Sequence, residues 1–166
     1  MKLELRTTIH AREVWKMLEY WVKEPALQKH EEHCEWLEDT VFHIKEGSVE
    51  VTEKLQNPPD YLFYMIYHKE EHVGFVEAFS RPFDFYGLSI DITSICVFDE
   101  HRGKGIVKEA LQLLINQLFD TFPNARHISC QTGLDNKPMV RHLTELGFQR
   151  KDSTKIGEIF LYERSS

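Results

Sequence analysis

The sequence predicts a single α+β domain, and three observations support this prediction. Segments rich in β-branched residues alternate along the chain with amphipathic helical segments. Two glycines stand where one strand-like run passes into a helical run, as expected of a strand that leads into a helix through a short loop. The length of 166 residues and the hydrophobic content of 42% are sufficient for one hydrophobic core. We therefore expect one domain over residues 1–166.

The first sixty residues are predicted to contain one strand and two helices. Alternation indicates a strand over residues 2–7, and Thr8 can cap a helix that continues to about residue 23. A second, more charged helical pattern covers residues 28–44. The sequence Asn-Pro-Pro-Asp at residues 57–60 is the clearest break in the chain.

The central part is predicted to contain three consecutive antiparallel strands. Residues 61–68 and 72–80 have the pattern of a β-hairpin, and residues 81–87 are expected to form a loop. Residues 90–97 are rich in β-branched side chains and only lightly charged, which is typical of a strand in the middle of a sheet.

The C-terminal part is predicted to contain two helices and three strands. Apolar residues recur at helical spacing over residues 106–119, and a second helix is expected over residues 136–146. Strands are expected at residues 126–131, 148–151 and 156–163.

The loop that precedes the first of these two helices has the features of an anion-binding site. The first backbone N–H groups of a helix have no intrahelical partner and lie at the positive end of its dipole, so a phosphate can accept their hydrogen bonds. Gly103 and Gly105 lack the Cβ atoms that would hinder its approach, while Arg102 and Lys104 add positive charge. The spacing fits neither the P-loop nor the dinucleotide fingerprint. An ordinary surface turn before a helix is the alternative interpretation.

Two motifs in this region resemble those of a known family. The pattern Arg102-x-x-Gly105-x-Val107 resembles the Arg/Gln-x-x-Gly-x-Gly/Ala loop of the GNAT superfamily, the acyl-CoA-dependent N-acyltransferases; only the valine departs from it. Residues 136–148 resemble the superfamily's helix that begins with Asn and ends in Leu-Gly-Phe. The two motifs stand in the expected order and at the expected distance.

The resemblance extends over residues 88–150 and carries implications for the fold. Residues 105–110, followed by the terminal Phe119, are similar to the RimJ/RimL-like branch, which contains ribosomal-protein N-terminal acetyltransferases. The family implies a three-layer α/β arrangement in which a mixed, mostly antiparallel sheet has helices on both faces. Its fourth and fifth strands splay apart, and the pantetheine arm of the cofactor lies between them.

The same resemblance implies an activity and a set of cofactor-binding residues. A primary amine of a small molecule or of a peptide N-terminus would attack the thioester of acetyl-CoA directly in a ternary complex, without a metal. Asn136 resembles the residue near the pantetheine end, and it can also cap its helix. The residues that would bind the cofactor are Cys96 and Val97 through their main chain, Arg102, Gly103, Lys104, Gly105, Ile106 and Val107 around the pyrophosphate, and Asn136.

Two carboxylates are candidates for the base that takes the ammonium proton. We prefer Asp91, because an acid flanked by isoleucines in the strand before the glycine loop is well placed for this role. Glu77, in the preceding strand, is the second candidate. Either one can instead be an inert, solvated carboxylate, and a water-mediated route without a dedicated base also occurs in this superfamily.

The sequence departs from the family at the positions that supply the group that protonates the CoA thiolate. Many members have a Tyr where this chain has Leu143, and RimL-like members have a Ser where it has Met139. Neither replacement can donate a proton, which leaves solvent or the nearby His142 or Thr144. An acyl-CoA-binding protein with little or no transferase activity is therefore the alternative function. A domain without a cofactor would require both motifs to be coincidental.

Composition and charge narrow the choice of partners. The formal net charge of −7 disfavours nucleic acid and mildly favours cationic amines. No segment has the roughly 20 apolar residues of a membrane span, and the start of the sequence lacks a secretory signal, so we expect a cytoplasmic protein. In some members of this superfamily the closing strands pair between subunits, so a homodimer is one of the possible oligomeric states.

The three cysteines are expected to be reduced thiols. Cys34, Cys96 and Cys130 are odd in number and widely spaced. His30 and His33 lie near Cys34 and could bind a metal, but the glutamates around them favour a solvated helix face. We therefore expect no metal site.

Overall fold

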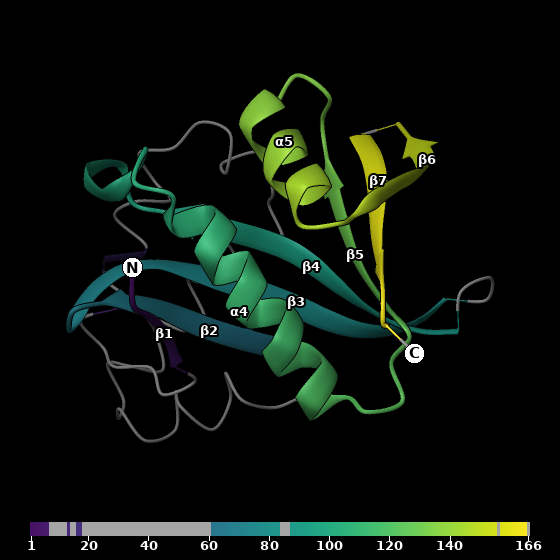
Figure 1. The fold of residues 1–166 in the computed structure, drawn as a ribbon, viewed down its shortest axis with the longest axis horizontal. Coiled ribbons are helices and arrows are strands. Elements are labelled where there is room, and N and C mark those ends of the chain that lie inside the picture. Colours follow the sequence, from purple (N-terminus) through teal and green to yellow (C-terminus); the bar gives the residue numbers. More distant parts are fainter. Residues whose placement is uncertain (7–12, 14–15, 18–60, 84–86, 156, 166) are drawn as a thin grey trace, which may run out of the picture.

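The computed structural model describes residues 1–6, 13, 16–17, 61–83, 87–155 and 157–165. They form a seven-stranded mixed sheet with the strand order β1-β2-β3-β4-β5-β7-β6 (Figure 1). Only β4 and β5 run parallel among the described pairs. The elements are β1 (Leu3–Arg6), β2 (Tyr61–His68), β3 (Glu71–Phe83), β4 (Gly87–Val97), the short 3₁₀ helix η1 (Asp99–His101), α4 (Ile106–Thr121), β5 (His127–Thr132), α5 (Lys137–Glu145), β6 (Gln149–Thr154) and β7 (Gly157–Glu163). The predicted fold class is confirmed.

Helix α4 covers one face of the sheet (Figure 1). Its spacing was the basis for predicting a helix over residues 106–119, and the structure confirms it. Ala110, Leu111, Leu114 and Leu118 are fully buried and join one hydrophobic cluster with side chains of the central strands, such as Ile90. Burying a leucine side chain stabilises the fold by about 1.5–3 kcal/mol, so this face holds the helix on the sheet.

The opposite face of the sheet carries a second buried layer. Along β2, Tyr64 and Ile66 belong to the cluster under α4, so the alternation of a strand directs Tyr67 to the other face. There Tyr67 donates a hydrogen bond to the buried carboxylate of Glu13, whose backbone is helical. A helical segment therefore lies on this face as well, as the fold class requires.

Strand β3 is longer than predicted. Its pairing with β4 continues to Phe83 opposite Gly87, the first residue of β4, so the expected loop over residues 81–87 is wrong for residues 81–83 and for residue 87. Pairing between β2 and β3 begins at Tyr61 opposite Phe79. Beyond Phe79, β3 has no described neighbour on that side, and an edge position tolerates a proline, which has no N–H to donate. Pro82 was misleading as a loop signal for this reason.

The fourth and fifth strands part after four residues each. Ser89–Ile92 of β4 pair with His127–Cys130 of β5, and no pairing is described beyond Ile92. β4 continues to Val97 along β3, whereas β5 stays paired with β7 through Thr132. Figure 1 shows the two strands close together at one end and diverging toward α5. The splay that the family resemblance implied is confirmed.

The C-terminal elements follow the prediction closely. Asn136 caps α5, because its side-chain oxygen accepts a hydrogen bond of 3.4 Å from the backbone N–H of Met139. Phe148 is buried after the helix, and β6 and β7 form the closing antiparallel pair. The side chains of β6 are exposed throughout, and β6 forms one edge of the sheet.

Several expectations concern residues that the structure does not describe. Most of the two N-terminal helices expected over residues 8–23 and 28–44 falls outside the described residues, as does the group of His30, His33 and Cys34. Of the cysteines within the described part, Cys96 and Cys130 are both outside any disulfide, and Cys130 is buried. Within the described residues, no helix is long and apolar enough to cross a membrane.

Candidate functional site

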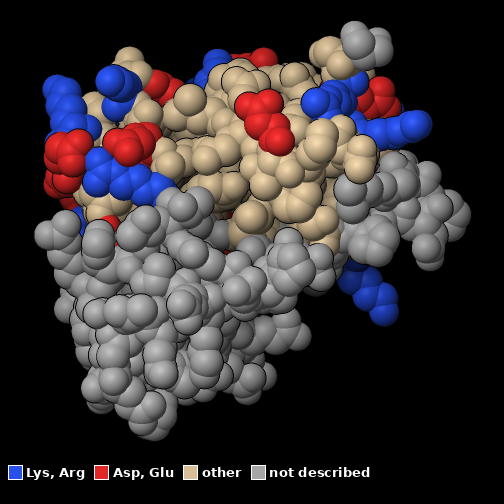
Figure 2. All heavy atoms as spheres, turned by 90° about the horizontal axis from the view of Figure 1, so that it is seen from below, with Lys and Arg blue, Asp and Glu red and all other residues tan. Residues whose placement is uncertain are grey.

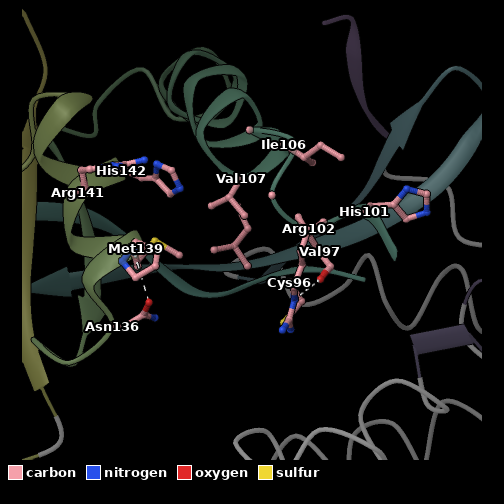
Figure 3. Close-up of a pocket in the computed structure, with 14 residues that line it drawn as sticks. Cys96, Val97, His101, Arg102, Ile106, Val107, Asn136, Met139, Arg141 and His142 are labelled. Atoms are coloured by element: carbon pink, nitrogen blue, oxygen red, sulfur yellow. Dashed lines mark hydrogen bonds between the residues drawn. The ribbon is translucent and has the colours of Figure 1, made fainter. Parts of the chain in front are cut away.

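A cavity of about 640 Å³ lies between the end of β4, the start of α4 and helix α5. Its walls come from two stretches of the chain that are distant in sequence, residues 95–107 and residues 136–142 (Figure 3). The described residues that line it are Ile95, Cys96, Val97, His101, Arg102, Gly103, Gly105, Ile106, Val107, Asn136, Pro138, Met139, Arg141 and His142. All of the residues predicted to bind a cofactor are among them except Lys104.

The glycine loop presents an open helix N-terminus to this cavity. Gly105 is the N-cap of α4 with φ of 76°, and Gly103 has φ of 74°. Both need the left-handed region, which favours glycine. A Cβ at either position would meet no atom of the described residues within 4 Å, so that part of the chain leaves the space beside them open. Because the first N–H groups of a helix have no intrahelical partner, this loop can hold a phosphate.

The two basic residues of the loop are also part of its framework. Arg102 donates from Nε to the carbonyl oxygen of Val97 at 3.2 Å, and its Nη1 lies 3.1 Å from Oδ1 of Asp99. Lys104 donates from Nζ to the carbonyl oxygen of Glu100 at 2.9 Å. Both side chains therefore fold the loop back onto η1, while their positive charges stay next to the open helix end.

Helix α5 lines the other side of the cavity with one face. Asn136, Met139 and His142 are three residues apart and therefore share a face of the helix (Figure 3). Nδ1 of His142 is buried and has no hydrogen-bond partner among the described residues. Burial lowers the pKa of His142, and the adjacent Arg141 cation lowers it further, so this ring is neutral near pH 7. The repeated spacing of three residues, from Asn136 to Met139 and from Met139 to His142, was the signal that could have identified His142 as a wall residue.

The two residues that follow His142 on this helix are not among the described residues that line the cavity. Leu143, which replaces the family's Tyr, is fully buried in the hydrophobic core. Thr144 donates its hydroxyl to the carbonyl oxygen of Val140 at 2.8 Å and is exposed. Of the two side chains considered for protonating the thiolate, only His142 lines the cavity.

Exposed ion pairs lie near the mouth of the cavity. Nζ of Lys108 on α4 lies 2.6 Å from Oε2 of Glu145 on α5, and Arg141 lies 3.6 Å from the same carboxylate. The hydrogen bond from Lys108 lowers the pKa of Glu145. Figure 2 shows acidic and basic side chains intermixed at both sides of the described part of one face, with a further acidic group between them. Such exposed pairs contribute little to stability.

A second, smaller pocket of about 170 Å³ occupies the space where β4 and β5 diverge. Ile95, Cys96, Asn136 and Met139 line both pockets, so the two adjoin. Its described lining residues are Ile92, Thr93, Ser94, Ile95, Cys96, Cys130, Gln131, Thr132, Asn136 and Met139. An elongated ligand can therefore extend from the glycine loop into the space between the strands.

The two candidate bases occupy different places relative to this space. Asp91 lies where β4 and β5 are still paired, and its Oδ1 accepts a hydrogen bond of 2.9 Å from Oγ of Ser129. Glu77 lies on β3, is 1% exposed, and its Oε1 accepts a hydrogen bond of 3.1 Å from Oγ1 of Thr93. Neither carboxylate is among the described lining residues, but Glu77 bonds directly to one of them.

The sequence was compared with models of protein families and with curated protein sequences. The model of the Acetyltransferase (GNAT) family matches residues 15–148. No curated protein sequence matches the chain significantly.

Solved structures with the same fold include three acetyltransferases. Campylobacter jejuni N-acetyltransferase PseH in complex with acetyl coenzyme A is 13% identical, with a TM-score of 0.67, and the match covers 99% of this chain and 100% of that chain. Aminoglycoside acetyltransferase AAC(6')-Ib in complex with coenzyme A is 16% identical, with a TM-score of 0.68 and coverages of 98% and 95%. A spermidine N-acetyltransferase SpeG chimera from Vibrio cholerae and hSSAT is 16% identical, with a TM-score of 0.69 and coverages of 97% and 93%. At these identities the likeness concerns the fold alone.

Proposed function

Because the chain belongs to the acetyltransferase (GNAT) family, we propose that it is an acetyl-CoA-dependent N-acetyltransferase. It transfers the acetyl group to a primary amine of a small molecule or of a peptide N-terminus by direct attack in a ternary complex. The observation that carries this proposal is the continuity of the two pockets, which joins an open helix N-terminus to the gap between β4 and β5. That shape fits a cofactor with a phosphate group at one end and a reactive thioester on a long arm.

The residues around these pockets fit acetyl-CoA in their chemistry. The backbone N–H groups at the start of α4, from Ile106 onward, would bind the pyrophosphate, with Arg102 and Lys104 supplying positive charge. The main chain of Cys96 and Val97 would pair with the pantetheine amides, and Asn136 stands beside both pockets. The bound thioester supplies the acyl group, and the protein supplies orientation and a route for the proton.

For the base, the contacts favour Glu77 over Asp91. A base must be within hydrogen-bond reach of the proton that it removes, directly or through one intermediary. Glu77 is connected to the space between the strands through Thr93. The described contact of Asp91 is with Ser129, in the part of the sheet where the strands are still paired.

The acceptor is proposed at the level of its chemical class. The solved structures of the same fold include enzymes named for aminoglycosides and for spermidine, which are cationic amines. The net charge of −7 is in line with such an acceptor. We therefore expect polyamines and aminoglycosides among the accepted amines, next to N-terminal peptides.

A non-catalytic acyl-CoA-binding protein is the second candidate. It is favoured by the apolar Met139 in the wall of both pockets and by the burial of Leu143 in the core. Loss of an assisting acid removes about 10²–10⁴-fold of rate, which lowers turnover without abolishing it.

The proposed function is tested by acetyl-CoA turnover, followed as free thiol release. The acceptors are a panel of polyamines, aminoglycosides, amino acids and N-terminal peptides, and calorimetric titration with CoA is run in parallel. Thiol release that depends on one amine class is the expected result. CoA binding without amine-dependent release would instead establish the non-catalytic binder.

The branch of the family, the cellular location, the extent of the domain and the oligomeric state remain predictions. The similarity to the RimJ/RimL-like branch rests on residues 105–110 and Phe119, whereas the comparisons support the family as a whole. A cytoplasmic location, a single domain over residues 1–166 and a homodimer are likewise still expectations. Fractionation of cells and light scattering of the purified protein test the location and the oligomeric state.

A further inference from the structure

We propose that Thr93 relays the proton of the acceptor amine to Glu77. This inference rests on the proposed N-acetyltransferase function and adds the route by which the amine becomes nucleophilic. It assigns a role to a hydroxyl that the sequence motifs do not mark.

The first observation is the position of Thr93 at an irregularity in the sheet. The register between β3 and β4 shifts between Glu77 and Ala78, which pair with Ser94 and Ile92. Thr93 is therefore the extra residue of a β-bulge, and bulges change the direction of a side chain relative to a regular strand. The same residue lines the pocket where β4 and β5 diverge. The bulge thus places one hydroxyl between β3 and the proposed acyl site.

The second observation is the pair of hydrogen bonds at this hydroxyl. Oγ1 of Thr93 lies 3.1 Å from Oε1 of Glu77 and 3.2 Å from the backbone carbonyl oxygen of the same residue. A hydroxyl has one proton to donate and two lone pairs to accept with. It can therefore donate to only one of these two oxygens at a time.

This arrangement gives Oε1 of Glu77 a hydrogen-bond partner in both protonation states of the carboxyl group. When the carboxylate is ionised, Thr93 donates to Oε1. When the carboxyl is protonated, it can donate to Oγ1, and Thr93 then donates to the carbonyl oxygen. Because a buried polar group that loses its partner is costly, a partner that can both donate and accept keeps Oε1 of the 1% exposed Glu77 hydrogen-bonded before and after the transfer.

The proposed proton and acyl transfers conserve atoms and charge. The ammonium group of the acceptor gives one proton to Oγ1 of Thr93, and the original hydroxyl proton of Thr93 passes to Oε1 of Glu77. The neutral amine then attacks the carbonyl carbon of the thioester, so that a C–N bond forms and the C–S bond breaks. A second proton leaves the nitrogen and neutralises the departing thiolate, and Glu77 later returns its proton to solvent through Thr93. The products are an amide, free CoA and one proton.

Three variants of the full chain test the relay. Thr93→Val keeps the shape but removes the hydroxyl, Thr93→Ser keeps the hydroxyl, and Glu77→Gln keeps the shape of the side chain but cannot accept the proton. Thr121→Val is the matched control, because it removes a hydroxyl that bonds a main-chain carbonyl at the end of α4, away from both pockets. For each variant, kcat, KM, CoA affinity and the melting temperature are measured with the best amine of the panel.

We expect Thr93→Val and Glu77→Gln each to lower kcat by about 100-fold or more, with CoA affinity unchanged. Thr93→Ser should restore kcat to within about threefold of the wild type, and Thr121→Val should leave it unchanged. The double variant of Thr93→Val and Glu77→Gln should be no slower than either single variant, since both act in one proton path. The loss of kcat in these variants should shrink as the pH approaches the pKa of the acceptor amine, about 10, because a neutral amine needs no base.

The outcomes separate this proposal from the function on which it rests. Wild-type kcat in Thr93→Val, a deficit that is the same at every pH, or multiplying effects of the two substitutions would each overturn the relay and leave the N-acetyltransferase function standing. Absence of amine-dependent thiol release by the wild type would overturn the function, and the relay with it. A lower melting temperature with unchanged kcat would show that Thr93 only stabilises the bulge.

Discussion

Oγ of Ser129 donates a hydrogen bond of 2.9 Å to Oδ1 of Asp91, and the two residues face each other in the parallel pairing of β4 and β5. The pair stands one position before the last described pairing, Ile92 with Cys130. A polar contact between side chains therefore supplements the backbone pairing close to the point where the strands part.

The first prediction concerns Asp91→Asn. Because the amide oxygen still accepts from Ser129, we expect a loss of stability of about 1 kcal/mol or less, and kcat within about threefold of the wild type. Chemical denaturation and steady-state kinetics measure the two effects. A fall of about 100-fold in kcat, with intact CoA binding, would make Asp91 the base in place of Glu77.

The second prediction concerns the glycine loop. Gly105 has φ of 76° with open space around it, so Gly105→Ala costs about 1–2 kcal/mol through backbone strain alone. Relief of this strain turns the N–H groups at the start of α4, and we expect CoA affinity to fall about tenfold, or about 1.4 kcal/mol. Isothermal titration with CoA measures this loss.

Gly147→Ala is the control for that measurement. Gly147 has φ of 97° and does not line either described pocket. It should show a similar loss of stability with unchanged CoA affinity. Equal affinities of the two alanine variants would contradict a role for the Gly105 backbone in binding.

The third prediction concerns Gly74, which the sequence motifs do not single out. Gly74 pairs with Val97, and a Cβ at this position would collide with the backbone carbonyl oxygen of Cys96. Gly74→Ala must therefore push β3 and β4 apart at the wall of the cavity. We expect a loss of about 2 kcal/mol or more together with weaker CoA binding. Wild-type stability of this variant would show that the strands can separate freely here.

The fourth prediction concerns pH. Burial raises the pKa of the Cys130 thiol from 9.0 to about 12, and the negative charge of Asp91 adds to the shift. The folded state keeps a proton that the unfolded chain loses, so this contribution to stability is complete below about pH 9 and is lost as the pH rises toward about 12.

Cys130→Ala removes this contribution. The effect is measured as the slope of the free energy of unfolding against pH. Between about pH 9 and pH 11, the free energy of unfolding should fall less steeply than in the wild type, by up to about 1.4 kcal/mol per pH unit. Cys96→Ala, at a half-buried cysteine outside any disulfide, is the matched control and should keep the wild-type slope. Identical slopes in all three proteins would refute the shifted pKa.

The local features of this protein were determined by its sequence. The apolar spacing that begins at Ile106 defined α4, and Asn136 marked the start of α5, because helical periodicity and capping depend on residues within a few positions. The glycine loop was predictable for the same reason. Its open N–H groups follow from a helix that starts directly after Gly105, whatever surrounds that helix.

The tertiary structure decided the features that depend on residues far apart in the chain. The extension of β3 through Pro82 depends on where β2 begins, and the contact of Thr93 with Glu77 depends on a register shift between two strands. The need for glycine at position 74 arises from the carbonyl oxygen of Cys96 in the next strand. Strand pairing and register are set by packing and backbone hydrogen bonds across the sheet, and a local pattern of side chains does not contain this information.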